Sequence, residues 1–313
     1  MLSDASLNHA DAARRATLGW ALSIPWLRTL VIDKDRRVAV HAVLLVIAAA
    51  LLAIALPVVP LVVTPLVLGI PHLASEARWM VVRARVPRRL QVGLAIAALT
   101  LAGLAVARRS GAECALGLGG IALALASAAR PGGGARGRAA ALLALVPCAG
   151  AVACALSKPF ACAVRDALIA SHALVTLGVW IFLFRRAPRF ALPAVGAVSV
   201  AVLAVGALRG SLVALAFLAS VHYAVWLVLV PIDAARGAGT PTFRMSVAGW
   251  RKDLGGPVLA AALATGVLVA ILVVTRGATP ARDLYLVAAR FHLWLEAAMA
   301  CFLVVTRRRA ATP

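Results

Sequence analysis

Long apolar stretches separated by clusters of basic residues are the feature that most constrains this chain. Hydrophobic residues make up 63% of its 313 residues and only 14% are charged. This apolar fraction exceeds that of ordinary soluble domains. A helix needs about 20 mostly apolar residues to cross the ~30 Å hydrocarbon core of a bilayer. The sequence therefore predicts an all-α, polytopic integral membrane helix bundle.

The intervals between charged clusters predict about ten transmembrane helices. The expected ranges are 38–57, 60–82, 91–107, 112–129, 139–156, 163–184, 191–208, 211–232, 256–275 and 284–306. The chain then divides into a basic amphipathic cytoplasmic segment (1–37), a transmembrane domain (38–306) and a basic cytoplasmic tail (307–313). Within the first segment, residues 10–32 either lie along the inner leaflet or form a disordered tail.

The distribution of positive charge predicts the topology. Alternate loops on one side, with the two ends of the chain, hold 23 Lys and Arg residues, and the intervening loops hold 7. Because positively charged loops are retained in the cytoplasm, we expect both termini there, in a multi-pass protein of the inner (plasma) membrane. The net charge of +21 follows these loops, so we expect membrane lipid and no nucleic acid as a partner.

Four histidines inside expected spans are the strongest functional signal: His72, His172, His222 and His292. Ionisable side chains at this depth are costly and need a partner or a function. Their spans all have even numbers, so the four helices run in the same direction. At about 1.5 Å per residue the histidines lie within ~6 Å of one depth. If these helices are neighbours, the four imidazoles converge on a single centre.

Two glutamates each follow one of these histidines by one helical turn. The pairs are His72 with Glu76 and His292 with Glu296, and positions i and i+4 share a helix face. We therefore expect both glutamates to take part in catalysis, either as further ligands or as acceptors that fix an imidazole tautomer. Imidazoles without thiolates favour iron, copper or zinc. A four-histidine Fe²⁺ centre keeps positions open for dioxygen.

Three aromatic residues near the histidines are candidates to line a cavity for a lipophilic substrate: Tyr223, Trp226 and Trp294. For Trp226, as for Trp79 and Trp180, an aromatic belt at the membrane interface is the competing interpretation.

The segment Gly69–Glu76 (GIPHLASE) resembles the Gly-x-Pro-His-Gly-Ala-x-Asp segment of the Brp/Blh family of membrane β-carotene 15,15'-dioxygenases. A looser similarity joins Val221–Trp226 to a Trp-His-Ser-x-Arg-His segment of that family. The resemblance implies non-haem iron held by His72 and His222, and an oxygenase that acts on a carotenoid or another apolar lipid. The chain departs from the family pattern at Leu73, at Glu76 and at Trp226, which replaces a family histidine.

Two other functions fit the same residues. Histidine pairs could hold b-type haem in an electron carrier, with each pair facing across a porphyrin. A transporter or structural membrane protein could instead use the His and Glu side chains as a proton relay or as interhelical pairs.

Overall fold

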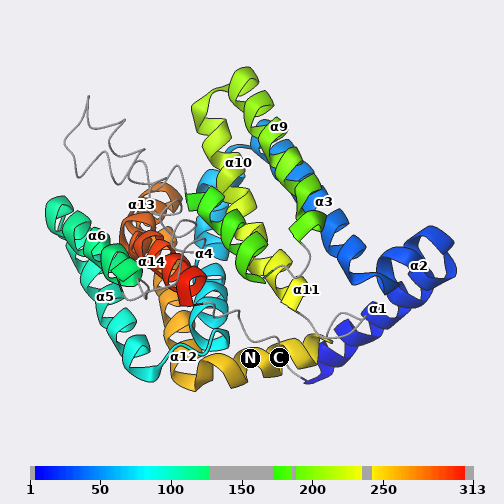
Figure 1. The fold of residues 1–313 in the computed structure, drawn as a ribbon, viewed down its shortest axis with the longest axis horizontal. Coiled ribbons are helices and arrows are strands. Elements are labelled where there is room, and N and C mark those ends of the chain that lie inside the picture. Colours follow the sequence, from blue (N-terminus) through cyan, green and yellow to red (C-terminus); the bar gives the residue numbers. More distant parts are fainter. Residues whose placement is uncertain (1–3, 127–171, 185–187, 235–241, 307–313) are drawn as a thin grey trace.

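The computed structural model describes residues 4–126, 172–184, 188–234 and 242–306, and all regular secondary structure in these residues is helical (Figure 1). The α-helices are α1 (Asp4–Ser23), α2 (Pro25–Ile32), α3 (Lys34–Ala55), α4 (Thr64–Glu76), α5 (Arg88–Val106), α6 (Ser110–Ala126), α9 (Leu192–Arg209), α10 (Ser211–Ala224), α11 (Val230–Ala234), α12 (Phe243–Arg276), α13 (Ala278–Ala289) and α14 (Phe291–Thr306). Four π-helical turns adjoin them, η1 (Val59–Val63), η2 (Ala77–Arg83), η3 (Trp180–Phe184) and η5 (Val225–Leu229), with a 3₁₀ turn η4 (Pro188–Ala191).

Seven helices in the described residues are long and apolar enough to cross a membrane, so the all-helical fold class is confirmed and these helices are candidate membrane spans. They are Lys34–Ala55, Val59–Arg83, Arg88–Val106, Arg189–Ala207, Val213–Ala234, Phe243–Arg276 and Ala278–Val304. Two further apolar helices, Ser110–Ala124 and His172–Phe184, are shorter within the ranges that the structure describes. The expected span 139–156 lies outside the described residues, as do parts of 112–129 and 163–184.

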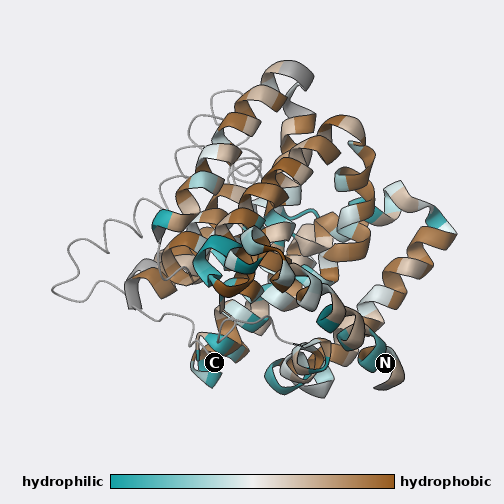
Figure 2. Cartoon of the chain, turned by 90° about the vertical axis from the view of Figure 1, so that its right-hand side faces the viewer, coloured by the Kyte–Doolittle hydropathy of each residue, from teal (hydrophilic) through white to brown (hydrophobic). Residues whose placement is uncertain are grey.

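The helices differ in how far they are buried, and this difference places the core. About half of the apolar window is buried in Val213–Ala234 (50%) and in Ala278–Val304 (56%), against 6% in Phe243–Arg276. The α14 helix packs on α6, and α3 packs on α9 and α10. Figure 2 shows hydrophobic residues along much of the long helices, and large ones such as Leu99, Leu203 and Leu263 are more than 70% exposed, as a lipid-facing surface requires. The α10 and α14 helices therefore form the interior, and α12 lies at the periphery.

Two helix irregularities were not predicted. The α12 helix begins 13 residues before the expected span and bends at Gly255, whose φ of 75° lies in the left-handed region that glycine adopts at little cost. The last span begins at Ala278 and is interrupted at Arg290, between α13 and α14. The interruption at Arg290 places His292 in the first turn of α14.

The N-terminal segment is helical in the described residues, so the disordered alternative for residues 10–32 is wrong. Trp20 and Trp26 are 62% and 66% exposed, as expected of helices that lie on a membrane surface. The α1 helix and the first half of α12 lie along the same end of the molecule (Figure 1). The backbone N–H of Phe243 donates to the Asp11 carboxylate at 2.7 Å, which joins the two helices.

An ion cluster fixes the first half of α12 against η2. The Nε atoms of Arg78 and Arg83 both donate to Oδ2 of Asp253, at 2.6 and 2.7 Å. The guanidinium of Arg78 also lies 5.1 Å from the ring centroid of Trp250 and 5.2 Å from that of Trp79. All three charged side chains are less than one-fifth exposed.

Asp253→Asn is expected to lower the free energy of unfolding by about 3 kcal/mol, because two largely buried arginines would lose their carboxylate. Thermal unfolding of the full chain in detergent measures this loss. Asp283→Asn is the control, since that carboxylate is 58% exposed beside Arg282 and should contribute little. Equal melting temperatures for the two variants would contradict the anchoring role of Asp253.

Candidate metal centre

The four intramembrane histidines converge. His72 lies on α4, His172 on the helix that the structure describes from His172 to Phe184, His222 on α10, and His292 in the first turn of α14. The centroids of neighbouring imidazole rings are 4.2 to 6.0 Å apart. The helices that carry them are therefore close neighbours, which is the condition that the sequence left open.

Three of these four helices pass into a π-helical turn within about two turns after their histidine, at η2, η3 and η5. Such turns are rare and occur often at functional sites. Each contains one tryptophan, and Trp79, Trp180 and Trp226 are only 4%, 0% and 0% exposed. The prediction of an interfacial aromatic belt is therefore wrong for these residues, because the helices pack together at this level. Ser75 donates to the carbonyl of Trp226 at 2.6 Å and joins α4 to η5.

A buried hydrogen-bond network joins three of the helices through Thr176, a residue that the sequence analysis missed. The Thr176 hydroxyl donates to Oε1 of Glu296 at 2.6 Å, and its oxygen lies 2.7 Å from Nδ1 of His222. A hydroxyl has one proton, so the second contact requires His222 to donate from Nδ1. His222 then carries its unprotonated lone pair on Nε2, the form that binds a metal ion.

Glu296 serves a different histidine from the one that its spacing indicates. Its Oε2 lies 2.9 Å from Nδ1 of His172, whereas Nδ1 of His292 donates to the carbonyl of Ala289 across the helix break. Nδ1 of His292 is used by this carbonyl, so it does not form the expected i, i+4 pair with Glu296. Nε2 of His172 and Nε2 of His292 lie 3.0 Å apart and share a hydrogen bond.

Several buried polar atoms of this cluster have no hydrogen-bond partner among the described residues: both ring nitrogens of His72, Nε2 of His222 and Oε2 of Glu76. Such atoms are rare in native proteins because each costs about 1–3 kcal/mol. The ligand atoms of His72, His222 and His292 lie within 4.8 Å of one another, as do those of His172, His222 and Glu296. The arrangement can hold a metal ion, and two of its histidines, His72 and His222, have ring nitrogens without a partner among the described residues.

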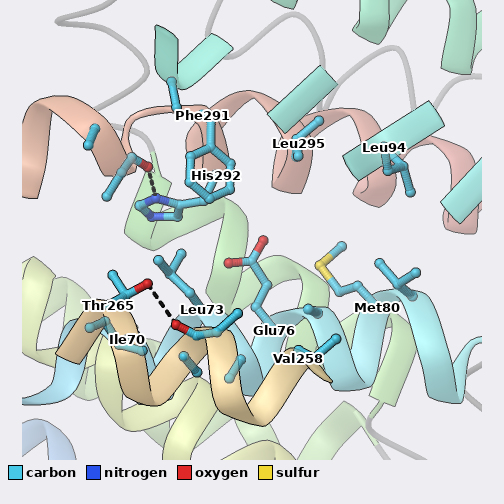
Figure 3. A pocket seen from close by; sticks show the side chains of 18 of the residues that line it. Ile70, Leu73, Glu76, Met80, Leu94, Val258, Thr265, Phe291, His292 and Leu295 are labelled. Atoms are coloured by element: carbon cyan, nitrogen blue, oxygen red, sulfur yellow. Dashed lines mark hydrogen bonds between the residues drawn. The ribbon is translucent and has the colours of Figure 1, made fainter. Parts of the chain in front are cut away.

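Two cavities flank the histidine cluster. One, of about 400 Å³, is lined by the four histidines together with Tyr223 and Tyr285. The other, of about 450 Å³, is almost entirely apolar, and Figure 3 shows the Glu76 carboxylate pointing into it between α4 and α14. Tyr285, Ala289 and His292 line both cavities. The cluster therefore lies between two apolar chambers.

Only one of the three aromatic candidates lines either cavity. Tyr223 does so, with its ring centroid 4.6 Å from that of His72. Trp226 packs instead against Phe184 in the core, at 6.0 Å between ring centroids. Trp294 points toward α6 and donates to Glu113 at 3.4 Å. The prediction that Trp226 and Trp294 line the cavity is therefore wrong, since adjacency in sequence to a histidine does not set the direction of a helical side chain.

Tyr285 is a second residue that the sequence analysis missed, and Gly69 makes room for it. A Cβ atom added at Gly69 would lie 2.2 Å from the hydroxyl oxygen of Tyr285 and 2.4 Å from Cζ. Gly69 lies one turn before His72 on the same face of α4. The Tyr285 hydroxyl is buried and has no hydrogen-bond partner in the described part of the chain. The glycine of the Gly-x-Pro-His segment thus makes room for a side chain that lines both cavities.

Gly69→Ala is expected to destabilise the fold by about 1–3 kcal/mol, because the new methyl group overlaps the phenol of Tyr285. Thermal melting in detergent measures the loss, which Tyr285→Leu in the same chain should reduce. Gly93→Ala is the matched control, since nothing lies within 4 Å of its added Cβ. The same loss from Gly69→Ala with either residue at position 285 would show that the tyrosine is not the cause.

Comparisons with other proteins leave the centre to be interpreted from its own geometry. No family model, no curated protein and no solved structure matches this chain. The resemblance of Gly69–Glu76 to the carotenoid dioxygenase segment therefore stays a prediction that rests on those residues.

Proposed function

We propose that this protein is an integral-membrane non-haem iron oxygenase whose four-histidine centre acts on a carotenoid or another apolar lipid. The observation that carries the proposal is the convergence of four buried imidazoles, with the nitrogens of His72 and the Nε2 of His222 unpaired among the described residues. Iron, when bound, supplies the binding and activation of dioxygen. His72, His222 and His292 would hold it, with His172 and Glu296 beside them.

The donor chemistry supports this choice of metal. Imidazoles with no thiolate among them suit iron, copper or zinc, and structural zinc sites are commonly thiolate-rich and closed. The Thr176 hydroxyl, fixed by Glu296, holds His222 in the tautomer that presents Nε2. Glu76 and Glu296 are 7% and 0% exposed, and a divalent cation beside them would balance carboxylate charge in a medium of low dielectric constant.

The surroundings of the centre support an apolar substrate. Apart from Glu76, Thr265, Tyr285 and His292, the larger cavity is lined by hydrophobic side chains (Figure 3). An elongated molecule could extend from one cavity to the other past the histidines. The apolar walls would exclude water, which strengthens electrostatic interactions at the centre.

The resemblance to the Brp/Blh family and the predicted topology belong to the same proposal. Ten crossings with both termini in the cytoplasm, in the inner (plasma) membrane, would agree with the excess of basic residues in alternate loops. Membrane lipid would then surround the domain and deliver the lipophilic substrate.

The hydrogen-bond network gives some support to a proton relay as the second candidate. Nε2 of His172 meets Nε2 of His292 at 3.0 Å, and the network continues through Glu296 and Thr176 to His222. The geometry does not favour b-type haem, because a porphyrin must lie between its two axial ligands and these rings are in direct contact.

Metal content and visible absorption of the purified full chain separate these functions. We expect about one iron per chain and no Soret band, with the iron lost in His72→Ala and in His222→Ala. His41→Ala is the control, since its Nδ1 contacts the backbone carbonyl of Arg37, at 2.8 Å, outside the cluster. Wild-type protein without any metal would overturn the oxygenase and leave the relay. A Soret band would indicate haem.

Thr176→Val is expected to weaken iron binding about 10- to 100-fold, because the tautomer of His222 would no longer be fixed. Valine has the same shape as threonine, so packing is retained. Competition with a chelator of known affinity measures the change. Thr176→Ser restores the hydroxyl and should bind iron as the wild type does. Equal weakening in both variants would refute the role of the hydroxyl.

A further inference from the structure

Arg290 lines the histidine cavity and adds a guanidinium group to its lining residues. It lies at the break between α13 and α14, two residues before His292. Its Nη2 donates to Oε2 of Glu113 at 2.8 Å, and Trp294 donates to the other oxygen of that carboxylate. Glu113 is only 3% exposed. The α6 helix therefore holds the guanidinium in a fixed position.

Arg290 lies where two cavities of different character adjoin. The histidine cavity has an otherwise apolar wall that includes Leu215, Leu218 and Leu286. A separate cavity of about 480 Å³ is lined by Arg108 and Ser110, from the turn between α5 and α6. Asp283, Val287 and Arg290 line both cavities. The largely apolar histidine cavity thus adjoins a more polar one, with Arg290 at the junction.

The Nε of Arg290 is buried and has no hydrogen-bond partner among the described residues. A buried N–H donor without an acceptor is costly, so an oxygen atom of a ligand at this position would be stabilised. The ion pair with Glu113 already balances the charge of the guanidinium, and the Asp283 carboxylate lines the same cavity. Asp283 is itself paired with Arg282, so neither ion pair leaves a net positive charge for an anion, and a neutral oxygen is favoured.

We propose that Arg290 binds the oxygen-bearing end of the ligand, and that the ligand is an apolar chain ending in a hydroxyl or carbonyl group. The oxygen would accept from Nε of Arg290, and the chain would extend past the four histidines toward the apolar cavity beyond Tyr285. The statement that this ligand is the substrate rests on the proposed function. The interaction with Arg290 itself needs no metal.

Binding of fluorescent conjugated octadecatetraenes to the full chain in nanodiscs tests this proposal. Three probes share one chain and end in a hydroxyl, a carboxylate or a methyl group. We expect the alcohol to bind about tenfold more tightly than the methyl-ended and carboxylate probes. Arg290→Gln combined with Glu113→Gln keeps a neutral hydrogen-bonding pair, and should bind all three probes within about twofold of one another.

Arg108→Gln is the matched control, because Arg108 lines only the polar cavity, and it should keep the tenfold preference. Equal binding of the three probes by wild type, or a preference that persists in the double variant, would overturn the proposal. Tightest binding of the carboxylate would overturn the neutral class of ligand. Iron measured in the same preparation separates the two proposals: a preference without iron contradicts only the oxygenase, and iron without a preference contradicts only the role of Arg290.

Discussion

The hydrogen bonds of Thr176 are the interaction on which the candidate centre depends. One hydroxyl joins Glu296 of α14 to His222 of α10, and the same carboxylate contacts His172. In an apolar interior each of these groups is costly unless it is paired. These hydrogen bonds therefore fix the position of α10, α14 and the helix of Thr176 along their axes relative to one another. Because the network uses Nδ1 of His222, Nε2 of the same ring is left without a partner among the described residues.

Composition and charge spacing predicted the helical membrane fold and the level of the four histidines, because both follow from hydrophobicity and from the rise of a helix. The residues that complete the site were not predictable in this way. Thr176, Tyr285 and Arg290 gain their roles from neighbours on other helices. The break at Arg290 also lies within an apolar run and has no proline or glycine signal. Trp226 and Trp294 were wrongly predicted to line the cavity for the same reason, because the sequence does not show which helix each side chain faces.

The peripheral helix α12 contributes one wall of the apolar cavity of about 450 Å³. Val258, Ala261 and Thr265 line it, whereas Leu263 and Val274 on the same helix are 71% and 86% exposed. The wall is therefore a single helix thick, and its outer surface has the character of a lipid contact. Its first half is fixed by Asp253 and its second half follows the bend at Gly255.

A wall of this thickness determines what concentration of ligand the cavity meets. An apolar molecule dissolved in the bilayer reaches α12 without crossing water, so its mole fraction in the lipid, and not its aqueous solubility, sets the occupancy of the site. Diluting the protein into more lipid at a constant total amount of ligand would then weaken apparent binding as effectively as removing ligand.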